Sequence, residues 1–293
     1  MSPTLIIDIV VTGLIMAGLY SVMAVGLNLQ IGISRVLNMS HGEFIMLGAF
    51  GAYLLYTLSG INPFVSVLIV APILFVIGFL IYITLFQRLR KRAKSIEMFE
   101  MNSLLASFGV LYIIDNIALL AWGSEIRAYT YLANPVNLLG SIFAANRLVI
   151  LLVAIVVGLA LFLFLWRARW GKAGRAVAQD LTNAQLIGIN VNTTLALYFG
   201  FGAFLAGVAG ILISMIYTIT PLMGMSYAII AIVVVVIGGL GNVLGGLLGA
   251  LILGFIASIT MHIDMALQLS VFYAVFMLIL LIRPQGVLGK TYG

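Results

Sequence analysis

The sequence contains no cysteine and very little charge. Only 8% of its 293 residues are Asp, Glu, Lys or Arg, far below the roughly 25% that is typical of soluble domains. The absence of cysteine excludes disulfides, thiolate metal sites and cysteine nucleophiles. Hydrophobic residues make up 64% of the chain, more than a soluble protein of this length can bury, so lipid must be its solvent. These proportions predict an integral membrane protein with many spans.

Acidic residues are scarcer than basic ones, eight against fourteen. The basic side chains concentrate at 88–94, 167–175 and 283–290. Each cluster adjoins an apolar run, so we interpret the charge as a topology signal and not as a nucleic-acid-binding surface. The positive-inside rule then places all three clusters in the cytoplasm. The first ten residues, MSPTLIIDIV, lack the basic region of a cleaved signal peptide, and we expect the first apolar run to be a retained span.

Long uncharged runs, divided at turn signals such as TLSGINP, predict an all-α polytopic fold. Nine apolar segments place the N-terminus outside and the C-terminus inside, and a broken segment that re-enters would lower the count to eight. We expect one transmembrane domain, 1–293, with two related halves of about 1–146 and 147–293 that each contain a broken helix. The predicted segments are about 9–34, 42–58, 64–86, 101–122, 148–166, 193–216, 226–240, 245–261 and 265–282.

The stretch RVLNMSHGEFIMLGAF (35–50) places three titratable side chains between two apolar runs. Ser40 and Glu43 have the spacing of a capping box, in which Ser40 caps the following helix and Glu43 reaches back to the Ser40 amide. This structural role accounts for Glu43, and a functional role is compatible with it. A helix that begins inside the membrane turns its positive dipole end toward the protein interior. Interrupted helices of this kind often line substrate paths in transporters. The candidate substrate-path residues here are therefore Asn38, Ser40 and His41.

A second interruption, GGLGNVLGG (238–246), lies in the other half of the chain. Asn242 is placed to cap the helix that follows and is the fourth substrate-path candidate. Gly241, Gly245 and Gly249 are four residues apart and predict a face for close packing. That face packs either within the chain or against a second membrane subunit.

One further carboxylate, Asp115, lies inside a predicted span. An intramembrane carboxylate is by default a functional hypothesis. Because Asp115 is nearer the outer end of its span, solvation at the interface or hydrogen bonding is the stronger explanation. No spacing in the sequence predicts a metal site.

The longest polar stretch assigned to the cytoplasm is GKAGRAVAQDLTNAQLIGINVN. Its apolar residues are spaced for one face of a short amphipathic helix over 174–187, which Gly188 stops. From the residues alone, such a helix either lies on lipid headgroups or docks into a soluble partner.

Four motifs, RVLNMSHGEFIMLGAFGAYL, RAVAQDLTNAQLIGINVN, GGLGNVLGGLLGALILG and RPQGVLG, extend over essentially the whole chain. In this order they resemble the membrane subunits of ATP-binding cassette importers for branched-chain amino acids, in particular the H-type permease subunit. The resemblance implies inward transport of branched-chain amino acids and a multi-pass location in a bacterial inner membrane. It also implies three kinds of partner: a second, usually different, permease subunit, two ATPase subunits and an external solute-binding protein.

The same resemblance implies that the cytoplasmic loop helix docks in a cleft of an ATPase subunit. The residues on which that coupling role would fall are Arg175, Ala178, Asp180, Ala184 and Gly188.

The chain itself is expected not to be an enzyme and to hold no cofactor, with ATP and magnesium bound by the partner ATPases. In agreement, the closing GVLGKTYG has Pro284 at the position where a phosphate-binding loop needs its first glycine. Two alternatives stay open: a permease for urea, short amides or another small polar solute, and an ion-coupled secondary transporter that acts alone.

Overall fold

The computed structural model describes residues 3–138 and 140–289, and this part of the chain is almost entirely helical. One antiparallel hairpin joins β1 (Pro135–Leu138) to β2 (Ser141–Ala144). The longer helices are α1 (Pro3–Gly32), α2 (His41–Ser59), α3 (Pro63–Ile81), α5 (Ile96–Trp122), α6 (Ala145–Arg167), α9 (Val191–Ser214), α10 (Met223–Gly238), α11 (Val243–Ile263) and α12 (Gln268–Ile282). The short elements are η1 (Tyr82–Phe86), α4 (Gln87–Arg92), α7 (Arg169–Gln179), α8 (Leu181–Leu186) and η2 (Met265–Leu267).

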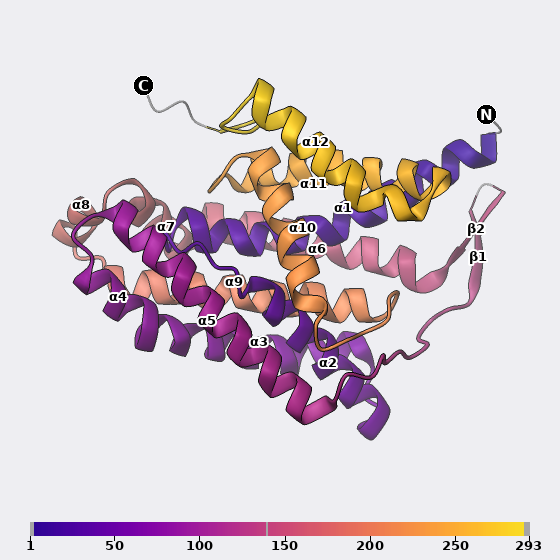
Figure 1. Cartoon of the computed structure of the whole chain (residues 1–293), viewed down its shortest axis with the longest axis horizontal. Coiled ribbons are helices and arrows are strands. Elements are labelled where there is room, and N and C mark those ends of the chain that lie inside the picture. Colours follow the sequence, from indigo (N-terminus) through magenta and orange to yellow (C-terminus); the bar gives the residue numbers. More distant parts are fainter. Residues whose placement is uncertain (1–2, 139, 290–293) are drawn as a thin grey trace.

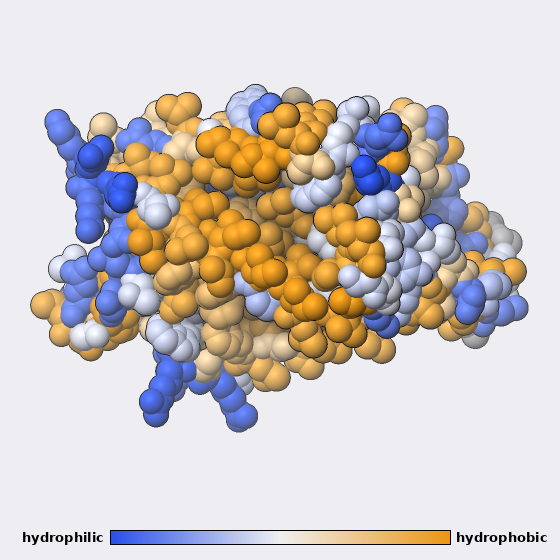
Figure 2. Space-filling model, turned by 90° about the horizontal axis from the view of Figure 1, so that it is seen from below, coloured by the Kyte–Doolittle hydropathy of each residue, from blue (hydrophilic) through white to orange (hydrophobic). Residues whose placement is uncertain are grey.

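Most of the long helices run along one axis of the molecule, with α4, α7 and α8 gathered at one end and the β-hairpin at the other (Figure 1). Within the described residues, eight helices are long and apolar enough to cross a membrane. A hydrophobic band covers the middle of the surface, and hydrophilic groups gather at its two ends (Figure 2). The prediction of an all-α polytopic fold is therefore confirmed.

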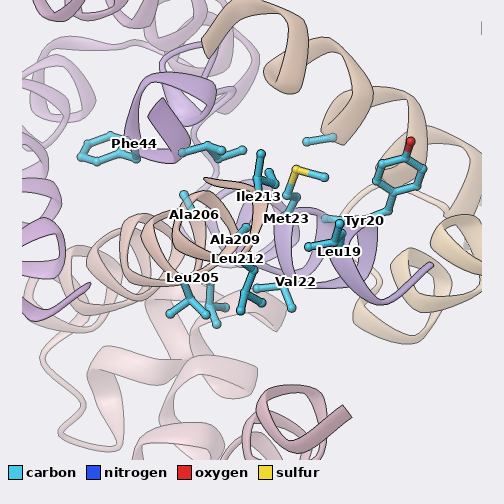
Figure 3. Packing of buried hydrophobic residues seen from close by; sticks show 14 of the residues in the cluster. Leu19, Tyr20, Val22, Met23, Phe44, Leu205, Ala206, Ala209, Leu212 and Ile213 are labelled. Carbon is cyan, nitrogen blue, oxygen red and sulfur yellow. The ribbon is translucent and has the colours of Figure 1, made fainter. Parts of the chain in front are cut away.

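The centre of the molecule is built around α9, which packs along both α1 and α2. Their apolar side chains interdigitate around Met23, Phe44 and Ile213, all at most 1% exposed (Figure 3). By contrast, α5, α6 and α12 turn large apolar side chains outward, and Leu281 is 80% exposed. The molecule is thus a buried helical core with an outer layer that suits lipid or another apolar partner.

Glycine allows α2 and α9 to approach at backbone distance. A Cβ added at Gly48 would overlap the backbone of Gly207, and one added at Gly210 would overlap the carbonyl oxygen of Ile45. Two helices without a hydrophobic driving force between them, as in lipid, are held by such van der Waals contact. The α2–α9 contact therefore depends on the absence of these side chains.

The second interruption separates α10 from α11, as the sequence predicts, but α10 is short. Its 16 residues rise about 24 Å, less than the roughly 30 Å of a bilayer core. In Figure 1, α10 runs steeply across the direction of α1 and α9. Eight long helices and one short oblique helix thus make up the nine apolar segments.

The expectation of one cytoplasmic helix over 174–187 is wrong. The structure has two helices, α7 and α8, with Asp180 in extended conformation between them. The Asp180 carboxylate accepts hydrogen bonds from the amides of Thr182 (2.7 Å) and Asn183 (3.0 Å). A side chain that satisfies the free amides of a helix start favours a new helix over a continued one.

We expect Gly210→Ala to destabilise the protein strongly, because overpacking in a tight core costs about 1–3 kcal/mol or more. Gly158→Ala is the matched control, since no atom lies within 4 Å of its added Cβ and alanine is the better helix former. Thermal unfolding in detergent, followed by size-exclusion chromatography, should show a lower midpoint for Gly210→Ala alone. Equal midpoints for the two variants would contradict the close α2–α9 contact.

Candidate functional site at the buried helix break

The connection between α1 and α2, residues 33–40, is extended and leads back toward the middle of the molecule (Figure 1). Two serines of α5 accept hydrogen bonds from backbone amides of this connection. The amide of Leu37 donates to Ser103 Oγ (3.2 Å), and the amide of Met39 donates to Ser107 Oγ (3.0 Å). The Ser107 hydroxyl in turn donates to the Leu37 carbonyl (3.1 Å). Non-helical backbone at membrane depth is tolerated where protein groups pair it in this way.

The Gln30 side chain, from α1, organises the polar side chains of the break. Its Nε2 donates to the carbonyl of Phe199 in α9 (3.1 Å), and its Oε1 accepts from Asn38 Nδ2 (2.9 Å). The same oxygen lies 3.1 Å from His41 Nδ1, and His41 Nε2 lies 3.1 Å from the Met23 carbonyl. Gln30, Asn38 and His41 are at most 2% exposed. One amide thus ties α1, α9 and the break together.

The predicted capping box is wrong. Ser40 does occupy the N-cap position of α2, but its side chain makes no capping bond. Its hydroxyl donates instead to Asn38 Oδ1 (2.6 Å), and its amide donates to the same oxygen (3.1 Å). Because Asn38 already serves the Ser40 amide, Glu43 is not needed there. Neither carboxyl oxygen of Glu43 has a hydrogen-bond partner among the described residues.

Glu43 lies where two helices begin. A Cβ added at Gly42, second residue of α2, would overlap the backbone of Gly224, second residue of α10. A Cβ added at Gly224 would overlap the carboxyl group of Glu43. The Glu43 carboxyl packs directly against Gly224. Each helix start carries a partial positive charge from its free amides, and a carboxyl group there is stabilised. The Glu43 carboxyl therefore lies where two helix starts converge.

Asp115 of α5 interacts with the Glu43 carboxyl. It is 9% exposed, and its Oδ1 has no hydrogen-bond partner in the described part of the chain. Of the two roles expected for Asp115, solvation at the interface does not fit this burial, and hydrogen bonding stays a prediction. The two carboxyl groups form a pair between α2, α5 and the start of α10, which sequence spacing could not reveal.

The second break is fastened by another amide of α1, Asn28. Its Oδ1 accepts from the amide of Gly241 (3.0 Å), and its Nδ2 donates to the carbonyl of Asn242 (3.2 Å). Asn242 caps α11 as predicted, because its Oδ1 accepts from the Gly245 amide (3.1 Å). Its Nδ2 donates to the Leu288 carbonyl (2.9 Å). Its side chain therefore serves the helix start and the tail.

The four substrate-path candidates thus fall into two places. Asn38, Ser40 and His41 are hydrogen-bonded in one buried cluster, whereas Asn242 lies on the other side of α1. Asn28 and Gln30, which reach the two breaks, are two residues apart and so point about 200° apart on the helix.

The predicted close-packing glycines also divide. Gly245 and Gly249 of α11 face the α10 backbone at Gly238 and Val234. Gly241 precedes α11, has φ +74° and contacts the backbone of Gly32 instead. All three close contacts are within the chain.

The five predicted coupling residues lie along α7, α8 and their ends. Arg175, Asp180 and Gly188 are exposed, and the Arg175 guanidinium donates to the Leu165 carbonyl. The Ala178 carbonyl accepts from Arg35 (3.4 Å), and Ala184 is only 2% exposed. Ala184 is therefore buried against the rest of the chain, and its neighbours on α8 form the outward face.

A helical membrane protein with broken helices and polar clusters at the breaks has features of a membrane transport component. The comparison with known families is consistent with this. The family described as "Branched-chain amino acid transport system / permease component" matches residues 9–282. The chain belongs to this family.

Individual relatives match over nearly their whole length. The high-affinity branched-chain amino acid transport system permease protein BraD of Pseudomonas aeruginosa is 30% identical over 294 residues, which cover 96% of this chain and 94% of BraD. LivH of Salmonella typhimurium, a permease protein of the same description, is 30% identical over 95% of this chain and 94% of its own. LivH of Escherichia coli K12 is 29% identical over the same shares. No solved structure matches the chain.

We expect Asn28→Leu to destabilise the protein by about 1 kcal/mol, because it removes two hydrogen bonds to the backbone of the second break. Asn116→Leu is the matched control, since its exposed amide bonds only to the carbonyl one turn earlier (2.7 Å). Protease protection of the segment around Gly241 should fall in Asn28→Leu and stay unchanged in Asn116→Leu. Full protection in both variants would show that Asn28 does not hold the break.

For the carboxyl pair, we expect Glu43→Gln to remain close to wild type in thermal stability. The amide keeps the size of the side chain and adds a donor toward Asp115. Glu43→Leu fills similar space but leaves the Asp115 carboxyl without a polar neighbour, and should cost about 1–3 kcal/mol more. If both variants melt at the same temperature, the contact between Glu43 and Asp115 does not contribute to the stability of the protein.

Proposed function

We propose that this chain is the membrane-spanning subunit of an importer that moves branched-chain amino acids into the cytoplasm. The observation that carries the proposal is the family match over residues 9–282. The near full-length alignment with BraD and LivH supports the same substrate class. The chain would not be an enzyme, and ATP and magnesium would be bound by separate ATPase subunits.

The proposed orientation has the N-terminus outside and the C-terminus inside. The basic residues of α4 and α7 lie at the same end of the molecule (Figure 1). By the positive-inside rule this end faces the cytoplasm. The start of α1 and the β-hairpin lie at the opposite end. The tail after α12 bonds to the end of α10 through the amide of Val287 (2.8 Å) and carries Arg283 on the inner side; Lys290 lies outside the described residues.

The proposed partners are a second permease subunit, two ATPase subunits and an external solute-binding protein. The outward apolar faces of α5, α6 and α12 suit lipid and the second permease subunit equally well. We propose that Asn38, Ser40 and His41 line the substrate path when the break rearranges, with Asn242 at its inner side. Weak polar contact of this kind would guide a zwitterion without holding it.

The proposed docking surface for an ATPase subunit is the exposed end of α8. Leu186 is 79% exposed and Ile187 is 72% exposed, beside the charged Asp180. Two large apolar side chains in water at a cytoplasmic end are unfavourable unless a partner covers them. Because Ala184 is buried, the ATPase would contact Leu186, Ile187 and Gly188 and not the opposite face of α8.

The importer should be tested by reconstitution of the chain with its partner subunits in proteoliposomes. We expect uptake of labelled leucine that requires ATP and the loaded binding protein. Competition with urea and acetamide separates the amino-acid permease from one for small amides. Uptake by this chain alone, driven by a proton or sodium gradient, would contradict the importer.

For the docking surface, the double variant Leu186→Asp and Ile187→Asp should abolish co-purification of the ATPase subunits. Membrane insertion should be unaffected, because both side chains already face solvent. Ile126→Asp, at a 71% exposed apolar residue of the opposite end, is the control and should retain the ATPases. Normal ATPase recovery with the double variant would place the docking surface elsewhere.

A further inference from the structure

A small pocket of about 230 Å³ opens near the outer end of the molecule. It lies between the loop after α5, the start of α6 and the segment after α9. Its size is below the roughly 300–1,000 Å³ of pockets for drug-sized ligands, so it fits a small solute. The lining residues that carry the argument are Tyr129, Tyr131, Asn146, Arg147, Met215 and Ile216.

Arg147 supplies a positive charge to this pocket that the structure does not otherwise use. It forms no ion pair or hydrogen bond with any described residue; the single salt bridge recorded for them joins Arg35 to Glu100 (3.9 Å). The other arginine at this end, Arg127, donates to the Trp122 carbonyl (2.9 Å) and lies over the Tyr53 ring. Among the described residues Arg147 thus has no carboxylate partner, although its charge acts on Tyr217. A carboxylate is the group that it would bind best.

Asn146, the neighbour of Arg147, contributes an unpaired acceptor. Its Nδ2 donates to the carbonyls of Tyr131 (3.1 Å) and Met215 (3.0 Å), which fixes the orientation of the amide. Its Oδ1 then has no donor, although the residue is only 6% exposed. A buried acceptor without a donor is unfavourable by about 1–3 kcal/mol. An ammonium group in the pocket would supply that donor.

The remaining wall is aromatic and apolar. Burial raises the pKa of Tyr129 to about 12, so its hydroxyl stays protonated at neutral pH. The hydroxyl is paired with Ser214 Oγ (2.8 Å), which holds the ring in place. Tyrosine rings attract ammonium groups, and Met215 and Ile216 offer contact for an aliphatic side chain.

We propose that this pocket binds a free aliphatic amino acid zwitterion at the outer mouth, before it enters the membrane path. The carboxylate would pair with Arg147, the ammonium with Asn146 Oδ1, and the side chain would contact Met215 and Ile216. The inference rests on the proposed function, since it assigns a receiving site for the same substrate class.

The test uses the assembled importer in nanodiscs, without ATP and without binding protein. Direct binding is measured for L-leucine, for leucinol, which lacks the carboxylate, and for 4-methylvalerate, which lacks the ammonium. We expect leucine to bind weakly, with a dissociation constant of about 1 mM. Each analogue should bind about tenfold more weakly. Leucinol binding as tightly as leucine, or no leucine binding, would overturn the proposal.

Arg147→Gln should weaken leucine binding about tenfold and leave leucinol binding unchanged, because leucinol makes no contact that the variant removes. Arg147→Lys should restore most of the leucine affinity. Arg169→Gln, an exposed arginine of the cytoplasmic end, is the charge-matched control and should leave both ligands unchanged. Equal losses for leucine and leucinol in Arg147→Gln would show a structural effect and would overturn the assignment of the carboxylate partner.

ATP-driven leucine uptake, with binding protein present, is measured on the same wild-type preparation. Uptake without the pocket binding described above would refute the pocket and leave the proposed function standing. Absence of leucine uptake, with ATP-driven uptake of another solute, would refute the proposed function itself.

Discussion

The structure depends on the polar contacts that hold two helix breaks in place, one at 33–40 and one at the start of α11. Helix α1 supplies two amide side chains for this purpose. Gln30 pairs with the side chain of Asn38 in the first break, and Asn28 pairs with the backbone of the second. Both side chains donate and accept at once, which a hydroxyl or a charged group at the same position could not do with the same reach. Their opposite directions on α1 make this helix the shared support of both breaks.

The first break also accounts for the positions of Gly42, Gly224 and Glu43. Once the first break starts α2 inside the molecule, its free amides must face something. They face the start of α10, and Gly42 and Gly224 let the two backbones touch. The Glu43 carboxyl packs against Gly224 at this contact, and Asp115 lies beside it. The acid, the glycines and the short α10 are therefore one arrangement, and a change in any of them alters the others.

The helices could be predicted closely from sequence because uncharged run length is a direct consequence of bilayer thickness. The break at 33–40 and the cap at Asn242 also followed from local residue types. Asn28 and Gln30 were missed because each is a single uncharged polar residue within an apolar run. The available signal was that they are the only amide side chains in that span. The Asp180 break was missed because Asp180 was assigned to the polar face of one helix. The pairing of Glu43 with Asp115 brings together residues far apart in the chain, which spacing along it does not encode.

These contacts also connect the break to the cytoplasmic end. Arg35, within the break, is held at φ +56° in a conformation rare for residues other than glycine. Its side chain donates to the Ala178 carbonyl of α7 and lies near Glu100 of α5. A displacement of α7 and α8 by an ATPase would therefore act on the backbone next to Asn38 and His41 without an intermediate element. A break whose polar groups are satisfied by exchangeable hydrogen bonds, and not by packing alone, is suited to occupy a second arrangement when that displacement occurs.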